Sequence, residues 1–97
     1  MIVSFIDQAS EDIFDGKNTK STQKRLPPNL QSVARRKLDM LNAATTLDDF
    51  RVPPSNRLEK LHGNRKHQHS IRINDQYRIV FTWIDGNAED VEIVDYH

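Results

Sequence analysis

The sequence predicts an α+β domain: an antiparallel sheet of about four to five strands with two helices packed on one face, in the chain order βααββββ. Two observations predict this class. Before Pro54 the longest apolar pattern has helical spacing, and after Pro54 the apolar residues alternate with a period of two between short turns. Strands joined by short turns pair antiparallel. Because the 97 residues are enough to close one hydrophobic core, residues 1–97 are predicted as a single domain.

The N-terminal half predicts one strand and then helices. IVSFI, residues 2–6, is the first predicted strand, and Asp7 or Ser10 is predicted to cap a short helix. The next segment, DGKNTKSTQKRLPP, has almost no apolar residue, which predicts a mobile loop over residues 15–28. The clearest helix is NLQSVARRKLDMLNAA, residues 29–44, whose apolar side chains fall on one stripe. Thr46 and the residues after it have the pattern of a capping box that opens one more short turn.

The C-terminal half predicts a meander of strands. The predicted strands are RLEKL, QHSIRI, YRIVFTW and VEIVDY, with turns at GNRK, at Asn74-Asp75-Gln76 and at Asp85-Gly86-Asn87. A three-residue turn at 74–76 keeps isoleucine opposite isoleucine and places Arg72 directly opposite Arg78. If the next hairpin centres on Gly86, Arg78 faces Val94 and Tyr96 follows on the arginine face.

The arginine pair is the main functional signal. Like charges directly opposite each other destabilise a sheet unless an anion lies between them, and a guanidinium pair suits a phosphate. Arg65 and Lys66 in the preceding turn can lean over the same face. The alternative is that the arginines are solvated or pair with carboxylates, for which Glu92, Asp90 and Asp95 are the candidates.

Charge is segregated along a chain whose formal net charge is +0. Residues 17–37 carry seven basic and no acidic side chains, and residues 51–78 carry seven basic against two acidic ones. Such segregation permits a cationic surface for a polyanion, or the blocks neutralise one another in the fold. With no cysteine, no basic leader and no long apolar run, we expect a cytoplasmic protein with no disulfide and no membrane partner. His67 and His69 are spaced to face the same way on a strand, but two imidazoles alone are weak evidence for a metal.

The segment NRLEKLHGNRKHQHSIRINDQYRIVFTW, followed by DVEIVDYH, resembles the HigB family of toxins, the plasmid-maintenance killer proteins of the RelE-like superfamily. The resemblance implies the microbial RNase-like fold and a ribosome-dependent endoribonuclease that cuts mRNA in the A site without a cofactor. It also implies neutralisation by a HigA-type helix-turn-helix antitoxin, through which the pair reaches its operator DNA.

The resemblance also implies site residues. The positions that match are Arg78 and the C-terminal Asp95, Tyr96 and His97, with Arg72 and the basic pair Arg65-Lys66. We expect the arginines to stabilise the phosphorane, His97 to act as general acid or base, Asp95 to orient it and Tyr96 to stack on the nucleotide. His62 stands where the family often has lysine and is a further candidate for proton transfer, and Glu59 stands where some members have histidine.

Two other functions remain open from the sequence. The sheet can be a non-catalytic RNA- or protein-binding module that serves as a corepressor with a helix-turn-helix antitoxin. Alternatively, the histidines can serve a metal-dependent hydrolase.

Overall fold

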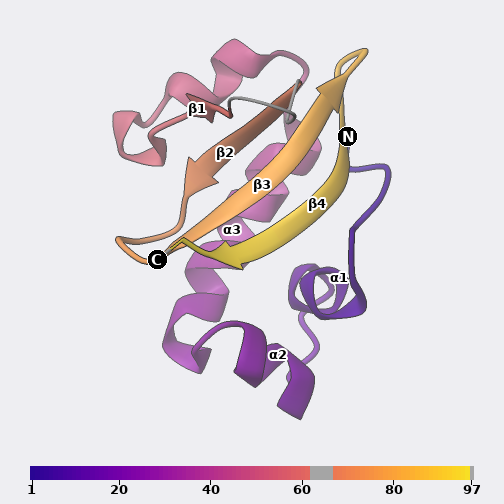
Figure 1. The fold of residues 1–97 in the computed structure, drawn as a ribbon, viewed down its shortest axis with the longest axis vertical. Coiled ribbons are helices and arrows are strands. Elements are labelled where there is room, and N and C mark those ends of the chain that lie inside the picture. The colour runs from indigo at the N-terminus through magenta and orange to yellow at the C-terminus, as the bar shows by residue number, and fades with distance from the viewer. Residues whose placement is uncertain (62–66, 97) are drawn as a thin grey trace.

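A computed structural model of the chain describes residues 1–61 and 67–96. Over these residues it contains three α-helices and a four-stranded antiparallel sheet with the strand order β1-β2-β3-β4 (Figure 1). Figure 1 shows α3 crossing behind the sheet. The α+β class is therefore confirmed, with one α-helix more than predicted. None of the helices within these ranges is long and apolar enough to cross a membrane.

The predicted helices form where the caps and the apolar stripe indicate. α1 (Gln8–Phe14) begins after Asp7, whose carboxylate accepts a hydrogen bond from the Ser10 backbone N–H at 2.9 Å. α3 (Pro28–Ala43) starts with a proline in its first turn, where a missing N–H costs nothing, and buries its apolar stripe against the sheet. The capping box at Thr46 opens the 3-10 helix η1 (Leu47–Arg51), and η2 (Pro54–Asn56) follows.

The prediction of a loop over residues 15–28 is wrong, because this segment contains the helix α2 (Lys20–Arg25). The Thr19 and Thr22 side chains cap each other's backbone N–H groups in a reciprocal box. Thr22 and Leu26 are fully buried and anchor the segment to the core. A helix this short needs only caps and one anchor, so it leaves no apolar stripe in the sequence for a periodicity argument to detect.

The strands are β1 (Glu59–Lys60), β2 (Gln68–Arg72), β3 (Tyr77–Ile84) and β4 (Asn87–Asp95). The predicted strand RLEKL is thus reduced to two residues, and the predicted turn GNRK lies outside the described residues. The core lies between one face of the sheet and the helices. Its largest fully buried side chains are Ile13, Leu26, Leu38, Leu41, Phe50, Ile71, Ile79, Phe81, Val91 and Ile93.

The β3–β4 connection differs from the predicted turn but gives the predicted register. Ile84 pairs with Asn87, so the turn has two residues, Asp85 and Gly86, both with positive φ (52° and 79°). The register then shifts by one residue beside Asp90, which also has positive φ (52°). This bulge supplies the residue that the shorter turn omits, and Arg78 pairs with Val94 as predicted.

The predicted first strand is reduced to two isolated parallel bridges, Ile2 to Ala88 and Phe5 to Val91. Between these bridges lies the bulge at Asp90, whose backbone N–H donates to the Ser4 side-chain oxygen at 2.8 Å. Because that N–H is taken by a side chain, the backbone ladder is interrupted there.

Candidate active site

The β2–β3 hairpin places the two arginines as the sequence predicts. Arg72 pairs directly with Arg78, and Ile71 pairs with Ile79 on the opposite, buried face. The Asn74 side-chain oxygen accepts hydrogen bonds from the backbone N–H groups of Gln76 (2.9 Å) and Tyr77 (2.8 Å). These bonds close the three-residue turn and fix the register that brings the arginines together.

Arg78 is held rigidly by its neighbours. Its side chain is only 9% exposed, and its Nε donates to Ser70 Oγ at 2.8 Å. Its Nη2 donates to the backbone carbonyls of Arg57 and Ser70. The remaining nitrogen, Nη1, lies 3.8 Å from a Glu59 carboxylate oxygen. Among the described residues, the Nη1 edge is therefore the part of the guanidinium that retains hydrogen-bonding capacity for a ligand.

Arg72 is less constrained. Its side chain is 29% exposed and forms an ion pair with Asp75, whose own side chain is 94% exposed. An exposed pair of this kind contributes about 0–1 kcal/mol, so a phosphate can replace the carboxylate at little cost. Within the described part of the chain the arginines thus have carboxylate partners, as the alternative held, but these are Asp75 and Glu59 and not the candidates Glu92 and Asp90.

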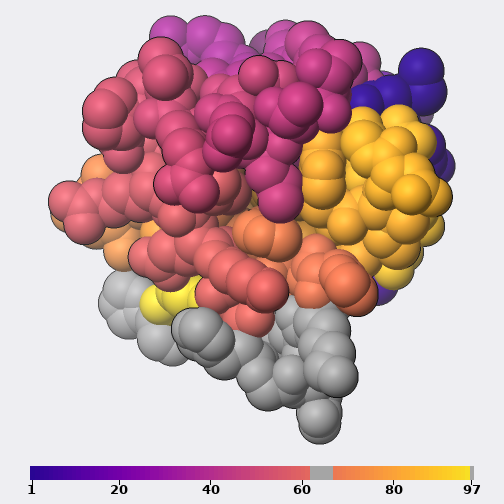
Figure 2. Space-filling view, turned by 90° about the horizontal axis from the view of Figure 1, so that it is seen from above, coloured from indigo at the N-terminus to yellow at the C-terminus, as the bar shows by residue number. Residues whose placement is uncertain are grey.

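Tyr96 lies beside Arg78. The guanidinium carbon is 5.7 Å from the centre of the Tyr96 ring, and Tyr96 is 45% exposed. Gln76 fixes this part of the chain, because its carbonyl accepts from the Tyr96 N–H at 2.6 Å and its side chain donates to Asp95 at 3.0 Å. Figure 2 shows the yellow C-terminal part of the chain against the red segment that includes β1.

These residues surround one pocket of about 260 Å³. It is lined by Arg57, Glu59, Arg72, Asn74, Asp75, Arg78 and Tyr96. The lining therefore combines three guanidinium groups with two carboxylates and one phenol. A phosphodiester fits this combination, since the cations offer donors to its oxygens and the ring offers a stacking surface for a base.

One predicted site residue among the described ones, Asp95, is not part of this pocket. Asp95 pairs with Tyr77 across the sheet and borders a separate hollow with Lys24 and Arg25. The reason is strand alternation, which puts Asp95 on the same side as Ile93 and opposite to Tyr96. The remaining predicted residues, His62, Arg65, Lys66 and His97, lie outside the described residues.

Sequence reasoning missed three residues that hold or line the site, Arg57, Ser70 and Gln76, and gave Glu59 only as the residue at a position where some family members have histidine. Ser70 had a signal, because it precedes Arg72 by two residues on the same strand and so shares its face. Arg57 had none. It adopts left-handed backbone angles (φ 45°), which directs its carbonyl to Arg78 and is uncommon for a residue with a side chain.

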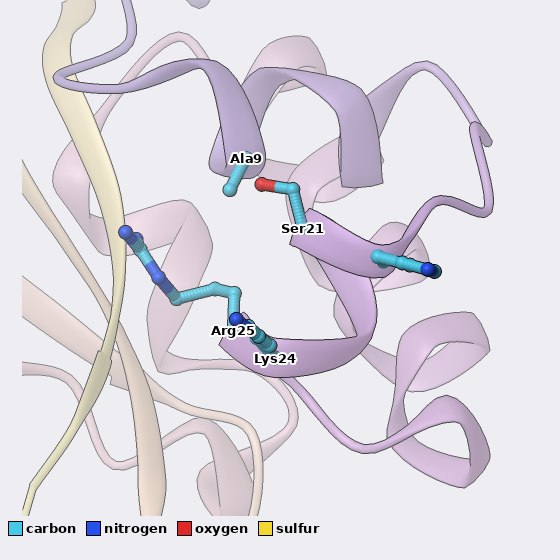
Figure 3. A pocket seen from close by; sticks show the side chains of 5 residues that line it. Ala9, Ser21, Lys24 and Arg25 are labelled. Carbon is cyan, nitrogen blue, oxygen red and sulfur yellow. The ribbon is translucent and has the colours of Figure 1, made fainter.

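A larger hollow of about 490 Å³ between α1 and α2 is also basic, but its cations do not converge. Figure 3 shows Arg25 extending from α2 toward the sheet, away from Ser21 and Ala9. There it pairs with Asp7 (2.7 Å) and donates to the Ile93 carbonyl (3.1 Å). Burial raises the pKa of Asp7, but the hydrogen bonds from Ser10 and Arg25 outweigh it and hold that pKa below its ordinary value. Arg25 therefore has a structural role, because it connects α2 to Asp7 and to β4.

The two spaced histidines form no metal site with other described residues. His67 lies outside β2 with positive φ (68°), and the His69 ring stacks on Phe81 with centres 6.2 Å apart. Burial lowers the pKa of His69, and the positive charge of Lys60 lowers it further. Within the described ranges no three His, Cys, Asp or Glu side chains are grouped closely enough to hold a metal ion.

Comparisons with known proteins identify the family of this chain. The family of HigB-like toxins, described as the RelE-like toxin of the type II toxin–antitoxin system HigB, matches residues 3–97. Toxin HigB-1 of Vibrio cholerae is 39% identical over 88 residues, which cover 91% of this chain and 90% of that protein. An uncharacterized protein of Haemophilus influenzae is 42% identical over 70 residues, or 72% of this chain and 69% of its own length. This chain therefore belongs to the HigB-like family of RelE-like toxins, whose members are one half of type II toxin–antitoxin systems.

Proposed function

We propose that the protein is a ribosome-dependent endoribonuclease that cleaves mRNA in the A site without a metal ion and thereby inhibits translation. Membership of the RelE-like toxins supports this class of activity. The observation that carries the proposal is the rigid placement of Arg78, with its Nη1 edge and the Tyr96 ring in the same pocket as Arg72.

The reaction uses the nucleophile of the substrate itself. The ribose 2′-oxygen attacks the adjacent phosphorus, the bond from phosphorus to the 5′-oxygen breaks, and the products are a 2′,3′-cyclic phosphate and a 5′-hydroxyl. Negative charge accumulates on the non-bridging oxygens of the phosphorane. Arg78 and Arg72 are the described cations that stabilise it, with Arg65 as a third. Because Arg78 is already fixed, this stabilisation needs little reorganisation.

Two proton transfers complete the step. The 2′-hydroxyl must lose a proton, and Glu59 is the pocket carboxylate nearest to Arg78, with its oxygen 3.8 Å from Nη1. We assign Glu59 to this role as general base. The departing 5′-oxygen must gain a proton, which we assign to His97 as general acid, with His62 sharing the transfer. Tyr96 stacks on the nucleotide.

Ribosome dependence follows from the weakness of this arrangement alone. No described group in the pocket activates the 2′-hydroxyl strongly, so the substrate must be held in line for attack, and the A site supplies that geometry. A HigA-type helix-turn-helix antitoxin neutralises the toxin in the cytoplasm, and operator DNA is reached only through that partner.

The test is an Arg78→Lys variant. This change keeps the positive charge but loses the Nη1 donors at the pocket, and one ammonium can replace only part of the bonds to Ser70 and to the Arg57 carbonyl, whereas Arg78→Ala would replace none of them. We expect mRNA cleavage to fall by at least about a hundredfold. Transcript 5′ ends are mapped after a short expression pulse, with translating ribosomes present or absent, and circular dichroism checks the fold.

The control is Lys20→Gln, which removes one charge from the exposed start of α2 and should cleave like the wild type. Cleavage by Arg78→Lys at the wild-type rate would overturn the assignment. A folded wild-type protein that cuts no transcript, while it still binds its antitoxin and operator, would favour the corepressor function instead.

A further inference from the structure

We propose that a second pocket, adjoining the active-site pocket through Arg72, binds the base and phosphate of a neighbouring nucleotide in the same RNA strand. This proposal rests on the proposed function and adds a second substrate contact to it. The second pocket has a volume of about 420 Å³ and lies between α3, the segment around η2 and β2. Arg72 lines both pockets, so a strand that leaves the first pocket meets the second without crossing another element.

The charge of the second pocket selects an anion. Arg36 and Lys37 are consecutive on α3 and line the hollow together with Arg72, and no carboxylate lines it. Among the residues that the structure describes, neither Arg36 nor Lys37 forms an ion pair. Like charges brought together without a counter-ion repel each other, and a phosphate would remove that repulsion.

A hydrogen bond to a buried side chain holds Lys37 in this position. Its ammonium donates to the side-chain oxygen of Asn56, which is fully buried and donates in turn to the Phe50 carbonyl at 3.2 Å. Burial lowers the pKa of Lys37, and the charge of Arg36 lowers it further. The fold therefore holds a cation where its charged form is disfavoured, and a bound anion offsets that cost.

Apart from Ser55, the remaining wall of the second pocket is apolar and suits the flat face of a base. Val33 and Met40 come from α3, Pro53 precedes η2 and Ile73 directly follows β2. An apolar wall with a cationic rim matches a nucleotide, which has an apolar base face and an anionic phosphate. An acidic peptide would satisfy the cations but would leave this wall without a partner.

The arrangement gives Arg72 a specific part. Its exposed partner Asp75 belongs to the turn, and the arginine side chain lies at the boundary of both pockets. A phosphate between two successive nucleotides can take the place of Asp75 at this boundary. Arg72 then contacts the reacting phosphate together with Arg78 and also lines the pocket of the neighbouring nucleotide, whereas Arg78 lines the first pocket alone.

The test measures binding without cleavage. Fluorescent RNAs carrying a 2′-O-methyl group at every ribose, one a dinucleotide and one a tetranucleotide, are titrated with wild type, Arg36→Gln and the charge-matched control Lys20→Gln. We expect Arg36→Gln to weaken tetranucleotide binding about fivefold and to leave dinucleotide binding unchanged, because only the longer RNA carries a phosphate beyond the reacting one for Arg36 to bind. Lys20→Gln should bind both RNAs like the wild type.

Each other outcome overturns the proposal in a distinct way. Equal tetranucleotide affinity for Arg36→Gln and wild type, with weaker binding by an Arg72→Gln variant, would remove the second pocket and keep the proposed active site. Weaker antitoxin binding by Arg36→Gln with unchanged RNA affinity would assign the pocket to an acidic protein segment. A wild-type protein that neither binds these RNAs nor cleaves mRNA would refute the proposed function itself.

Discussion

Arg78 shows what a buried cation requires. Moving a guanidinium group out of water costs on the order of several kcal/mol unless its N–H donors find acceptors and its charge is balanced. Here the compensation comes mostly from oxygens of neutral groups, Ser70 Oγ and two backbone carbonyls, and only weakly from Glu59 at 3.8 Å. Neutral acceptors satisfy the N–H donors without neutralising the positive charge, so Arg78 still attracts a phosphate although it is almost fully buried.

A Glu59→Gln substitution tests the proton acceptor. Gln keeps the shape of the side chain but does not take up the 2′-hydroxyl proton, so we expect cleavage on ribosomes to fall about a hundredfold or more. The comparison variant is Asp75→Asn, which removes the other pocket carboxylate. It frees Arg72 and should raise RNA affinity about twofold to fivefold. Single-turnover cleavage measures the rate for each variant, and its dependence on protein concentration gives the RNA affinity. Equal rates for Glu59→Gln and wild type would exclude this carboxylate as the base.

Pairing rules made part of this site predictable. The alternation on both sides of Asn74 allowed one register, so Arg72 and Arg78 could be set opposite each other from sequence alone. The approach of Glu59 and Arg57 could not be predicted, because it depends on a left-handed residue and on a strand of two residues. Neither feature has a sequence period.

At the scale of elements, one ion pair joins α1, α2 and β4. Asp7 caps α1 and pairs with Arg25 of α2, and Arg25 also donates to the Ile93 carbonyl of β4. The Ser10 hydroxyl accepts from the Ile93 N–H at 3.1 Å, so the same strand position is bonded from both helices. Short helices of six and seven residues are unstable alone, and these contacts to the sheet hold them in place.

An Asp7→Ala substitution should therefore destabilise the protein more than a cap alone explains. Loss of the cap costs about 1 kcal/mol, and the partly buried Arg25 loses its carboxylate as well, so we expect about 1–2 kcal/mol in urea unfolding. Because the folded pKa of Asp7 is lowered, its contribution is present above the unfolded pKa and disappears as the pH falls through the folded pKa. The difference in unfolding free energy between variant and wild type should thus shrink below about pH 4.

Glu11→Ala in the same helix is the control, expected to change stability by less than about 0.5 kcal/mol.

Predictability also differs between elements. The stripe of α3 and its length follow from spacing, and the structure confirms them. The β3–β4 hairpin was assigned the wrong turn and no bulge, yet Arg78 was placed correctly against Val94 because the two errors cancel. A shorter turn and a bulge each shift the pairing of the two strands by one residue. The hydrophobic pattern of the strands therefore fixes only the sum of these two shifts. The bulge is what lets Ala88, Val91 and Ile93 all face the core.

For the whole molecule, the segregated charge blocks are partly neutralised and partly brought together. Arg25 and Lys17 of the first basic block pair with Asp7 and Asp12 in the preceding residues 1–16, which carry four acidic and no basic side chains. Other members of the basic blocks, on α3 and on the β2–β3 hairpin, instead converge on two adjoining pockets. A neutral protein thus acquires a local cationic surface because the helix and the hairpin are packed against the same edge of the core.

This distribution predicts the salt dependence of RNA binding. Each neutralised phosphate of a single strand contributes a slope of about −0.7 in a plot of log affinity against log salt, so contacts to two phosphates, one held by Arg78 with Arg72 and one by Arg36, give a slope of about −1.4 for the tetranucleotide. Arg36→Gln should reduce the steepness by about 0.7, because one phosphate contact is lost, and Lys20→Gln should leave it unchanged. Fluorescence titrations at increasing salt measure both slopes. If the two variants changed the slope equally, the RNA would be responding to overall charge, and the two pockets would not form a defined track for its phosphates.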